Sequence, residues 1–284
     1  MKIRTWKGLL MAATVAFAVT ACNKDQNGTL PTETDATVED NQTIVEETEN
    51  VFGFNDDQFG GLAGLRVAGI DSAGKPLGPK PKGDKCAKVT QTNMNGVLTV
   101  VIDYGVPHDC DGKIVGGKMT ITMPLKPEKN ASGLFTQTIQ YEDFQRGKRK
   151  MSGVHVVNLS LESGRPVLKE SFSQSSITTE DGKTIVFNSS KTRRTDAKNT
   201  LRLDDDETSI TGSTTATGSD GKSFKSLITK ALLFKNACFK TSGAFAVAGT
   251  VEIERNGQPK TTVDFGDGTC DRTYTVNGVT KTRK

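Results

Sequence analysis

Six short turn sequences in this 284-residue chain constrain its fold more than any other feature. Three are Asp-Gly-Lys, beginning at Asp111, Asp181 and Asp220, and three are Asn-Gly, beginning at Asn95, Asn256 and Asn277. Asn, Asp and Gly tolerate the positive φ angles that both central residues of a two-residue hairpin turn need. The turns therefore predict a chain that folds back on itself repeatedly as β-hairpins.

The segments between these turns are rich in Thr, Val and Ile, as in VLTVVIDYG (97–105) and KTIVFNSS (183–190). TVEIER (250–255) alternates polar and apolar residues, which is typical of a half-buried strand. SLITKALLF (226–234) is too densely apolar for periodicity to decide, but it follows an Asp-Gly turn, so we expect a strand. We predict an all-β body of about a dozen strands, an antiparallel meander of hairpins in an extended or sandwich-like sheet. The sequence does not decide between this open sheet and a closed barrel.

The N-terminus has the layout of a secretory signal. Lys2, Arg4 and Lys7 precede an uncharged run of fourteen residues from Gly8 to Ala21, which is too short to span a bilayer. Val19-Thr20-Ala21-Cys22 resembles the lipobox of bacterial lipoproteins. The resemblance implies cleavage before Cys22 and acylation of its sulfur and its new amine, which would anchor the chain to a bilayer. A plain signal peptide with an incidental cysteine is the alternative.

Charge divides the mature chain into an acidic segment and a basic body. Ten acids and one lysine give residues 23–57 a charge of −9, which leaves +10 for residues 58–284. Few residues of the acidic segment could form a core, so we expect a disordered acidic linker over 22–60, with at most a short helix in Val45–Leu65. Residues 61–85 predict a Gly/Pro/Lys-rich loop. Lys24-Asp25 partly resembles a signal that directs some lipoproteins to the outer face of the outer membrane, but a solvated spacer is the preferred explanation.

A cysteine module occurs at both ends of the β-rich body, residues 86–284. Each copy runs Cys-x-Lys, a strand ending Asp-aromatic-Gly, a loop and Cys-Asp. Export favours oxidation, and the duplication favours two local disulfides, although crossed pairing stays open. The pairs would be Cys86–Cys110 and Cys238–Cys270. A four-thiol zinc site is the rival, but Cys-x-x-Cys is missing.

The second module also carries three aspartates, which are weak calcium candidates: Asp264, Asp267 and Asp271. The EF-hand pattern is missing, and turn formation explains these residues too, so we expect no metal and no cofactor.

Two basic clusters of the body could bind an anion. They contribute six candidate residues: Arg146, Lys148, Arg149, Lys150, Arg193 and Arg194. Nucleic acid would require interleaved aromatic residues for stacking, and few are present. In an envelope, acidic polysaccharide or lipid head groups are the expected anions, and an ordinary solvated surface is the alternative.

Catalytic patterns are weak. His108 lies in a cysteine-module loop, and His155 alternates with valines, so we expect it to face solvent. Gly-x-Ser-x-Gly is missing, and the two Ser-x-x-Lys matches, Ser72–Lys75 and Ser219–Lys222, lie in turns. The sequence contains no phosphate loop and no dinucleotide fingerprint. We therefore expect a protein that is not an enzyme.

The body also resembles a group of uncharacterised β-rich lipoproteins from Bacteroidota, through GSTTATGSDGKSF (212–224), LFKNACF (233–239) and residues 249–281. The resemblance implies a β-rich, lipid-anchored envelope protein and leaves its function open. We expect a location at the outer membrane and a structural or binding role. Its side of the membrane and its protein partners stay open. The alternative is a surface glycan-binding or lipid-carrier module.

Overall fold

The computed structural model describes residues 32–58, 85–124, 135–163, 165–196, 198, 205–238 and 245–283. The predicted signal peptide, Cys22 and nearly all of the predicted loop 61–85 lie outside these residues.

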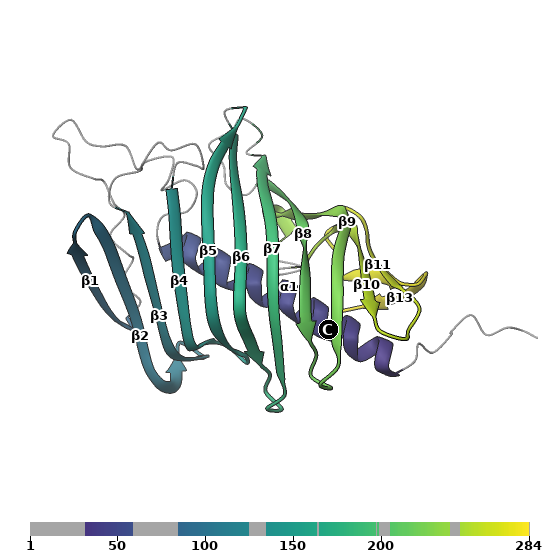
Figure 1. Ribbon diagram of the computed structural model, residues 1–284, viewed down its shortest axis with the longest axis horizontal. Coiled ribbons are helices and arrows are strands. Elements are labelled where there is room, and N and C mark those ends of the chain that lie inside the picture. The colour runs from purple at the N-terminus through teal and green to yellow at the C-terminus, as the bar shows by residue number, and fades with distance from the viewer. Residues whose placement is uncertain are drawn as a thin grey trace, which may run out of the picture.

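The body is a single antiparallel sheet of thirteen strands, in which each strand pairs with the next along the chain (Figure 1). The predicted all-β meander is thereby confirmed, and SLITKALLF lies in a strand. The strands are β1 (Lys88–Met94), β2 (Val97–Cys110), β3 (Lys113–Pro124), β4 (Phe135–Arg146), β5 (Lys150–Glu162), β6 (Arg165–Thr178), β7 (Thr184–Asp196), β8 (Glu207–Thr217), β9 (Ser223–Lys235), β10 (Ala248–Arg255), β11 (Thr261–Asp267), β12 (Thr273–Val276) and β13 (Val279–Thr282). A short 3-10 helix, η1 (Asn236–Cys238), follows β9.

All six turn sequences connect consecutive strands. At Asn95-Gly96, Asp111-Gly112 and Asn277-Gly278 both residues have positive φ, as the two-residue hairpin turn requires. In the other three turns, which contain Gly182, Gly221 and Gly257, only the glycine has positive φ. The turn residues thus predicted the connections, although half of the turns have a different backbone conformation.

The two faces of the sheet differ in burial. Along β7, Ile185, Phe187, Ser189, Lys191 and Arg193 are buried, whereas the side chains between them are exposed or half-buried. We call the face with the buried residues the inner face and the other the outer face. The apolar core lies on the inner face, as expected for an antiparallel sheet with one solvated side.

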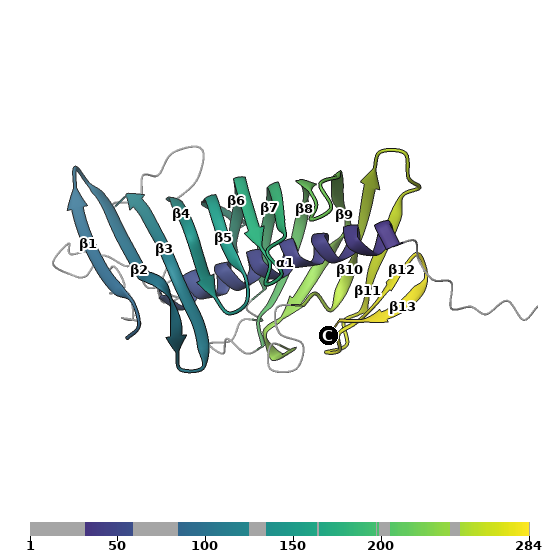
Figure 2. The ribbon, with the colours of Figure 1, turned by 90° about the horizontal axis from the view of Figure 1, so that it is seen from below.

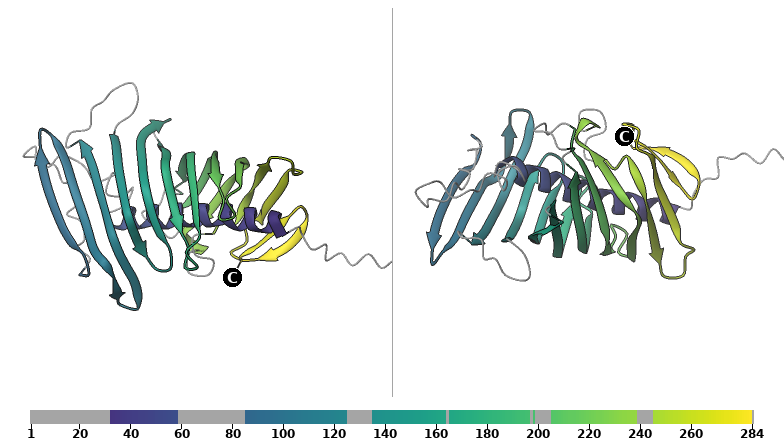
Figure 3. Two further views of the ribbon diagram at one scale, coloured as in Figure 1. Left: turned by 60° about the horizontal axis from the view of Figure 1, so that its bottom comes forward. Right: turned by 90° about the horizontal axis from the view of Figure 1, so that it is seen from above.

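Bulges bend the sheet toward its inner face. Register shifts interrupt the pairing of β3–β4, β4–β5, β5–β6, β6–β7, β8–β9 and β9–β10. Residues with positive φ lie at these positions: Gly117, Asp143, Gly153, Gln174, Gly212 and Gly249. Because a bulge bends its strand and increases the local twist, this series curves the sheet. The C-terminal strands β10–β13 curl around one end of the helix (Figures 2 and 3).

The acidic segment forms the helix α1 (Thr32–Gln58), which crosses the inner face from β13 toward β4 (Figure 1). The expectation of a disordered linker is therefore wrong for residues 32–58. The helix contains nine acids and no basic residue, and its buried positions include Asn41, Thr48 and Glu49. An apolar stripe of helical period, the usual sign of a packed helix, is therefore largely missing. The helix is held mainly by polar partners on the sheet.

Gly212 tests the role of the bulges. Its φ is 145°, and a Cβ there would lie 2.2 Å from the carbonyl oxygen of Ser190. We expect Gly212→Ala to lower the free energy of unfolding by about 3 kcal/mol, measured by urea denaturation. Gly221→Ala is the matched control, since its φ is 77° but nothing lies within 4 Å of its Cβ position. A cost of about 1 kcal/mol is expected there. Equal losses would contradict the account.

Candidate functional site

The densest set of polar contacts in the described residues joins α1 to the inner face. Its centre is Arg193 on β7, a fully buried guanidinium. Two of its nitrogens each donate to one carboxylate oxygen of Glu49, at 2.8 Å, and Nε donates to Glu170 Oε1 at 2.7 Å. The ring of Phe52 on α1 lies 3.9 Å from the guanidinium carbon. Arg193 therefore binds the helix and strand β6 at the same time, in the bidentate geometry of the strongest ion pairs.

Glu170 extends this network to His155 on β5. The His155 Nε2 atom lies 3.4 Å from Glu170 Oε2, and its ring stacks on Phe172 with centroids 4.0 Å apart. His155 is fully buried, so the expectation that it faces solvent is wrong. Its alternation with the neighbouring valines is real, but alternation does not tell which of the two faces is buried. The face of His155 is the one that α1 covers.

Lys191 is the second buried cation beneath the helix. It lies opposite Glu170 in the β6–β7 register, and its Nζ donates to Thr48 Oγ1 at 2.6 Å. The carboxylate of Glu49 lies 3.9 Å from the same Nζ. Burial lowers the pKa of Lys191, and the charges of Glu49 and Glu170 oppose that shift. The helix thus supplies the groups that compensate a lysine taken out of water.

Glu46 joins two distant parts of the sheet across the helix. Its carboxylate accepts from Arg283 Nε at 2.7 Å, just after β13, and from Arg149 Nη1 at 3.3 Å, just before β5. Arg149 also donates to Glu47 at 2.7 Å, and Arg283 also pairs with Glu39. The two arginines lie at the C-terminal end and near the middle of the meander. One carboxylate of α1 therefore closes the curved sheet around the helix.

The N-terminal half of α1 is held in the same way. Arg255 at the end of β10 donates to Thr37 at 2.6 Å, and Lys281 on β13 pairs with Asp35. Asp40 accepts from the backbone N–H of Ser219, at 2.8 Å, in the β8–β9 turn. We call the inner-face cations that contact α1 the charged groove: Arg149, Lys191, Arg193, Arg255, Lys281 and Arg283.

The pKa values of the acids shift in different directions. Burial raises the pKa of both Asp40 and Glu47 above the ordinary range, although hydrogen bonds from Ser219 and Arg149 act against it. For Glu170, burial would also raise the pKa, but the charges and hydrogen bonds of Arg193 and His155 together outweigh burial, and the value falls to about 2. Glu170 is thus the carboxylate whose ionised form the network favours most clearly.

Two of the six anion-binding candidates belong to the charged groove, and their carboxylate partners come from α1. Arg149 and Arg193 contact the helix, whereas Arg194, next in sequence, is exposed and pairs with Glu162 at 2.9 Å. Lys148 pairs with Glu180 at 3.3 Å, and both Arg146 and Lys150 are exposed. The six residues therefore do not form one patch.

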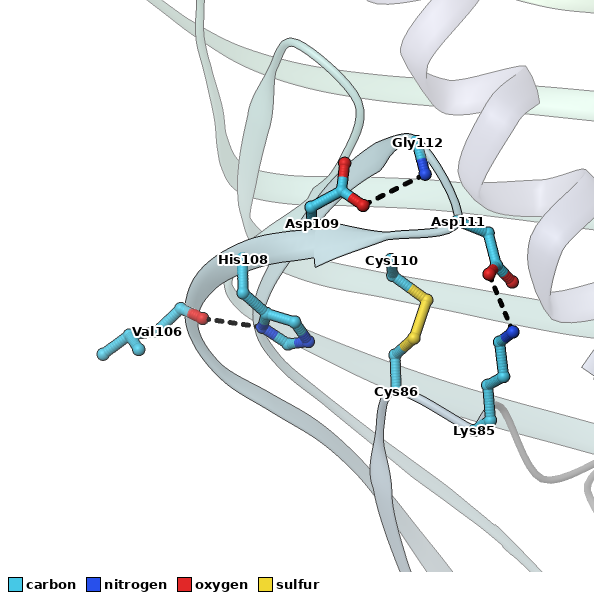
Figure 4. The surroundings of a disulfide bond; sticks show 8 residues. All are labelled: Lys85, Cys86, Val106, His108, Asp109, Cys110, Asp111 and Gly112. Carbon is cyan, nitrogen blue, oxygen red and sulfur yellow. Dashed lines mark hydrogen bonds and ion pairs between the residues drawn. A yellow bond between two sulfur atoms is a disulfide. The ribbon is translucent and has the colours of Figure 1, made fainter.

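The two predicted local disulfides, Cys86–Cys110 and Cys238–Cys270, are present. Figure 4 shows the first one, beside an ion pair of 2.7 Å between Lys85 and Asp111. The repeated Asp-aromatic-Gly has the same structure in both modules. Asp103 accepts from the N–H of Gly105, and Asp264 from that of Gly266, both at 2.8 Å.

The calcium candidates form local turns. Asp267 accepts from the backbone N–H of Thr269 at 3.1 Å, and Asp271 from that of Thr273 at 3.0 Å. These contacts, like that of Asp264, are typical of aspartates that stabilise turns. Within the described residues, no group of three or more His, Cys, Asp or Glu side chains could hold a metal ion.

Features of a glycan binder or a lipid carrier are also weak in the described part of the chain. Its exposed large apolar side chains are aliphatic: Met94, Val97, Val106, Ile114, Leu161, Val186 and Leu227. A shallow depression of about 340 Å³ opens among the bulges of β4–β6, where Asp143 and Ser152 hydrogen-bond to each other. The inner face below α1, where a carrier would place an apolar trough, bears charged side chains.

One signal in the sequence could have identified the charged groove. Lys191 and Arg193 follow Ile185 and Phe187 at even spacing, so they lie on the same face of the strand as the core. Long cations on a core face need buried anions, and the acid-rich segment 32–58 is a ready source of them. Composition alone favours the surface for such basic residues, and that expectation is wrong for these two.

No protein-family model, no curated protein and no solved structure matches the chain. The geometry of the charged groove and of α1 is therefore the basis for a functional proposal.

Glu49→Gln tests the buried ion pair. Glu49 and Arg193 are about 5% and 4% exposed, so loss of the carboxylate leaves an incompletely paired buried charge. We expect the free energy of unfolding to fall by about 3 kcal/mol in urea denaturation. Glu162→Gln removes the partner of the neighbouring Arg194, in a half-exposed pair, and should cost less than about 1 kcal/mol. Similar losses in the two variants would show that burial of the network has no effect.

Glu170 predicts a specific dependence of stability on pH. Its pKa is lowered from 4.5 to about 2, so its contribution is complete above pH 4.5 and disappears as the pH falls toward 2. Because the pKa values of Asp40 and Glu47 are raised, these two residues change the stability in the opposite direction as the pH falls. Both are present in the wild type and in the Glu170→Gln variant, so their effect cancels in a comparison of the two. Urea unfolding between pH 5 and 2 should therefore show a shallower loss of stability for Glu170→Gln than for the wild type. Parallel curves would contradict the assignment.

Proposed function

We propose that the chain is a lipid-anchored protein of the bacterial envelope, with a non-catalytic structural or binding role. The observation that carries the proposal is the docking of α1. The helix begins ten positions after Cys22 and is bound along the inner face of the sheet. An acyl anchor on Cys22 would therefore be connected to the folded body itself.

The length of the connection sets how far the body can lie from the bilayer. Residues 23–31 separate Cys22 from α1, and nine residues span at most about 30 Å. The N-terminal half of α1 is bound by β10 and β13, so this end of the sheet would face the membrane. The β1 end, with its exposed Met94 and Val97, would point away from it.

The two disulfides also support the proposal. Disulfides tie both ends of the body, as is common in proteins exported to an oxidising compartment. Among the described residues, no helix combines the length and the apolar character needed to cross a membrane.

The buried polar groups also favour a non-catalytic role. Arg193, Glu49 and Glu170 neutralise one another beneath the helix, with His155 against Glu170. This arrangement stabilises the docked helix. A binding or structural role needs only this folded arrangement, with α1 docked on the sheet.

Metabolic labelling with an alkyne fatty acid in a bacterial host tests the anchor. We expect label in the wild-type chain and in the Cys86→Ala/Cys110→Ala variant, which lacks two other cysteines, and none in Cys22→Ala. The Cys22→Ala protein should also leave the membrane fraction. Label that persists in Cys22→Ala, or a wild-type chain without label, would overturn the proposal. Protease treatment of intact cells then determines the side of the membrane.

A further inference from the structure

The contacts of α1 resemble those of a bound ligand more than those of a core helix. Arg149, Lys191, Arg193, Arg255, Lys281 and Arg283 contact it through carboxylates or hydroxyls. Among the α1 side chains that the structure describes, Val38, Ile44 and Val51 are buried in the apolar core, and Val45 and Phe52 pack against it at partial burial. Charge and hydrogen bonding therefore determine the fit at least as much as apolar burial does.

The isolated segment is a poor helix. It has nine acids and no cation, and Asp35 and Glu39 stand four positions apart, where like charges destabilise a helix. Gly53 weakens it further. The segment thus has the composition of a chain that folds only when its charges are matched, which is how many disordered segments bind their partners. Residues 59–87 connect it to β1, so a released helix would stay attached to the body by a chain of 29 residues.

The interface is also imperfect. The side-chain nitrogen of Asn41, buried against the sheet, has no hydrogen-bond partner. An unpaired buried donor is unfavourable, and water would satisfy it if the helix left. Release therefore regains some of the free energy lost when the ion pairs break.

We propose that the charged groove is an interaction surface for acidic helical segments, and that α1 is its resident, displaceable occupant. The partner that fits is a protein segment that forms a helix, lacks Lys and Arg, and presents carboxylates at the spacing of Glu39, Glu46 and Glu49. These three acids contact Arg283, Arg149 and Arg193. While α1 is docked, a partner must compete with a helix of the same chain, so only a well-matched acidic helix gains access. The inference does not depend on acylation of Cys22.

Hydrogen–deuterium exchange of the full chain tests whether α1 opens independently. Glu46→Gln removes a carboxylate that contacts both Arg149 and Arg283. Glu162→Gln is the matched control, since it also removes one carboxylate, here from the half-exposed pair with Arg194. We expect α1 amides to exchange at least ten-fold faster in Glu46→Gln, with the amides of β5–β7 unchanged, and Glu162→Gln to behave as the wild type. If α1 and the sheet lose protection together, or if Glu46→Gln unfolds the sheet, α1 is a core element and the proposal is wrong.

A fluorescent peptide with the sequence of residues 32–58 then tests the groove. We expect anisotropy to show at least ten-fold tighter binding to Glu46→Gln than to the wild type or Glu162→Gln, because α1 competes less in Glu46→Gln. Unlabelled peptide should displace the probe, whereas polyglutamate and polygalacturonate at equal charge should not. Absence of binding to Glu46→Gln would overturn the proposal. Equal displacement by either polymer would also overturn it, since the groove would then recognise charge alone.

Discussion

The bidentate ion pair between Glu49 and Arg193 is the central contact between α1 and the sheet. Arg193 is a cation on the buried face of a strand, and such a position is unfavourable unless an anion accompanies it. Glu170 supplies one carboxylate from the next strand, and Glu49 supplies a bidentate partner from the helix. While α1 is docked, the helix therefore neutralises the inner face of the sheet, and the sheet neutralises the charge of the helix.

This mutual neutralisation of charge explains how α1 fits into the curved sheet. A row of bulges curves the sheet, and Glu46 then joins Arg149 and Arg283 across the helix, although these arginines come from distant parts of the chain. An open meander of thirteen strands would otherwise leave its inner face without a second layer. A single charged helix supplies part of that layer.

The sequence predicted the body far better than it predicted the site. Turn dipeptides and alternation are local signals, and they predicted the meander. The strand at residues 226–234 was predicted from its place after a turn, and the duplicated module favoured the two local disulfides, although crossed pairing stayed open. The helix could not be predicted, because its buried face carries Asn41, Thr48 and Glu49. Of these, Thr48 and Glu49 are paired with Lys191 and Arg193, which are distant in the sequence. The acidic composition of residues 32–58 predicts how this segment would behave without the cations of the sheet. His155 was misplaced for a related reason, since alternation distinguishes two faces without telling which one α1 covers.

A double-mutant cycle between Glu46 and Arg283 tests the central claim, that charge pairing holds α1 on the sheet. Glu46→Gln, Arg283→Gln and the double variant would be compared by urea denaturation of the full chain. Since the side chains are 14% and 8% exposed, we expect a coupling free energy above about 1 kcal/mol. Losses that add within about 0.3 kcal/mol would contradict the account, because the helix would then be held by contacts other than its charges.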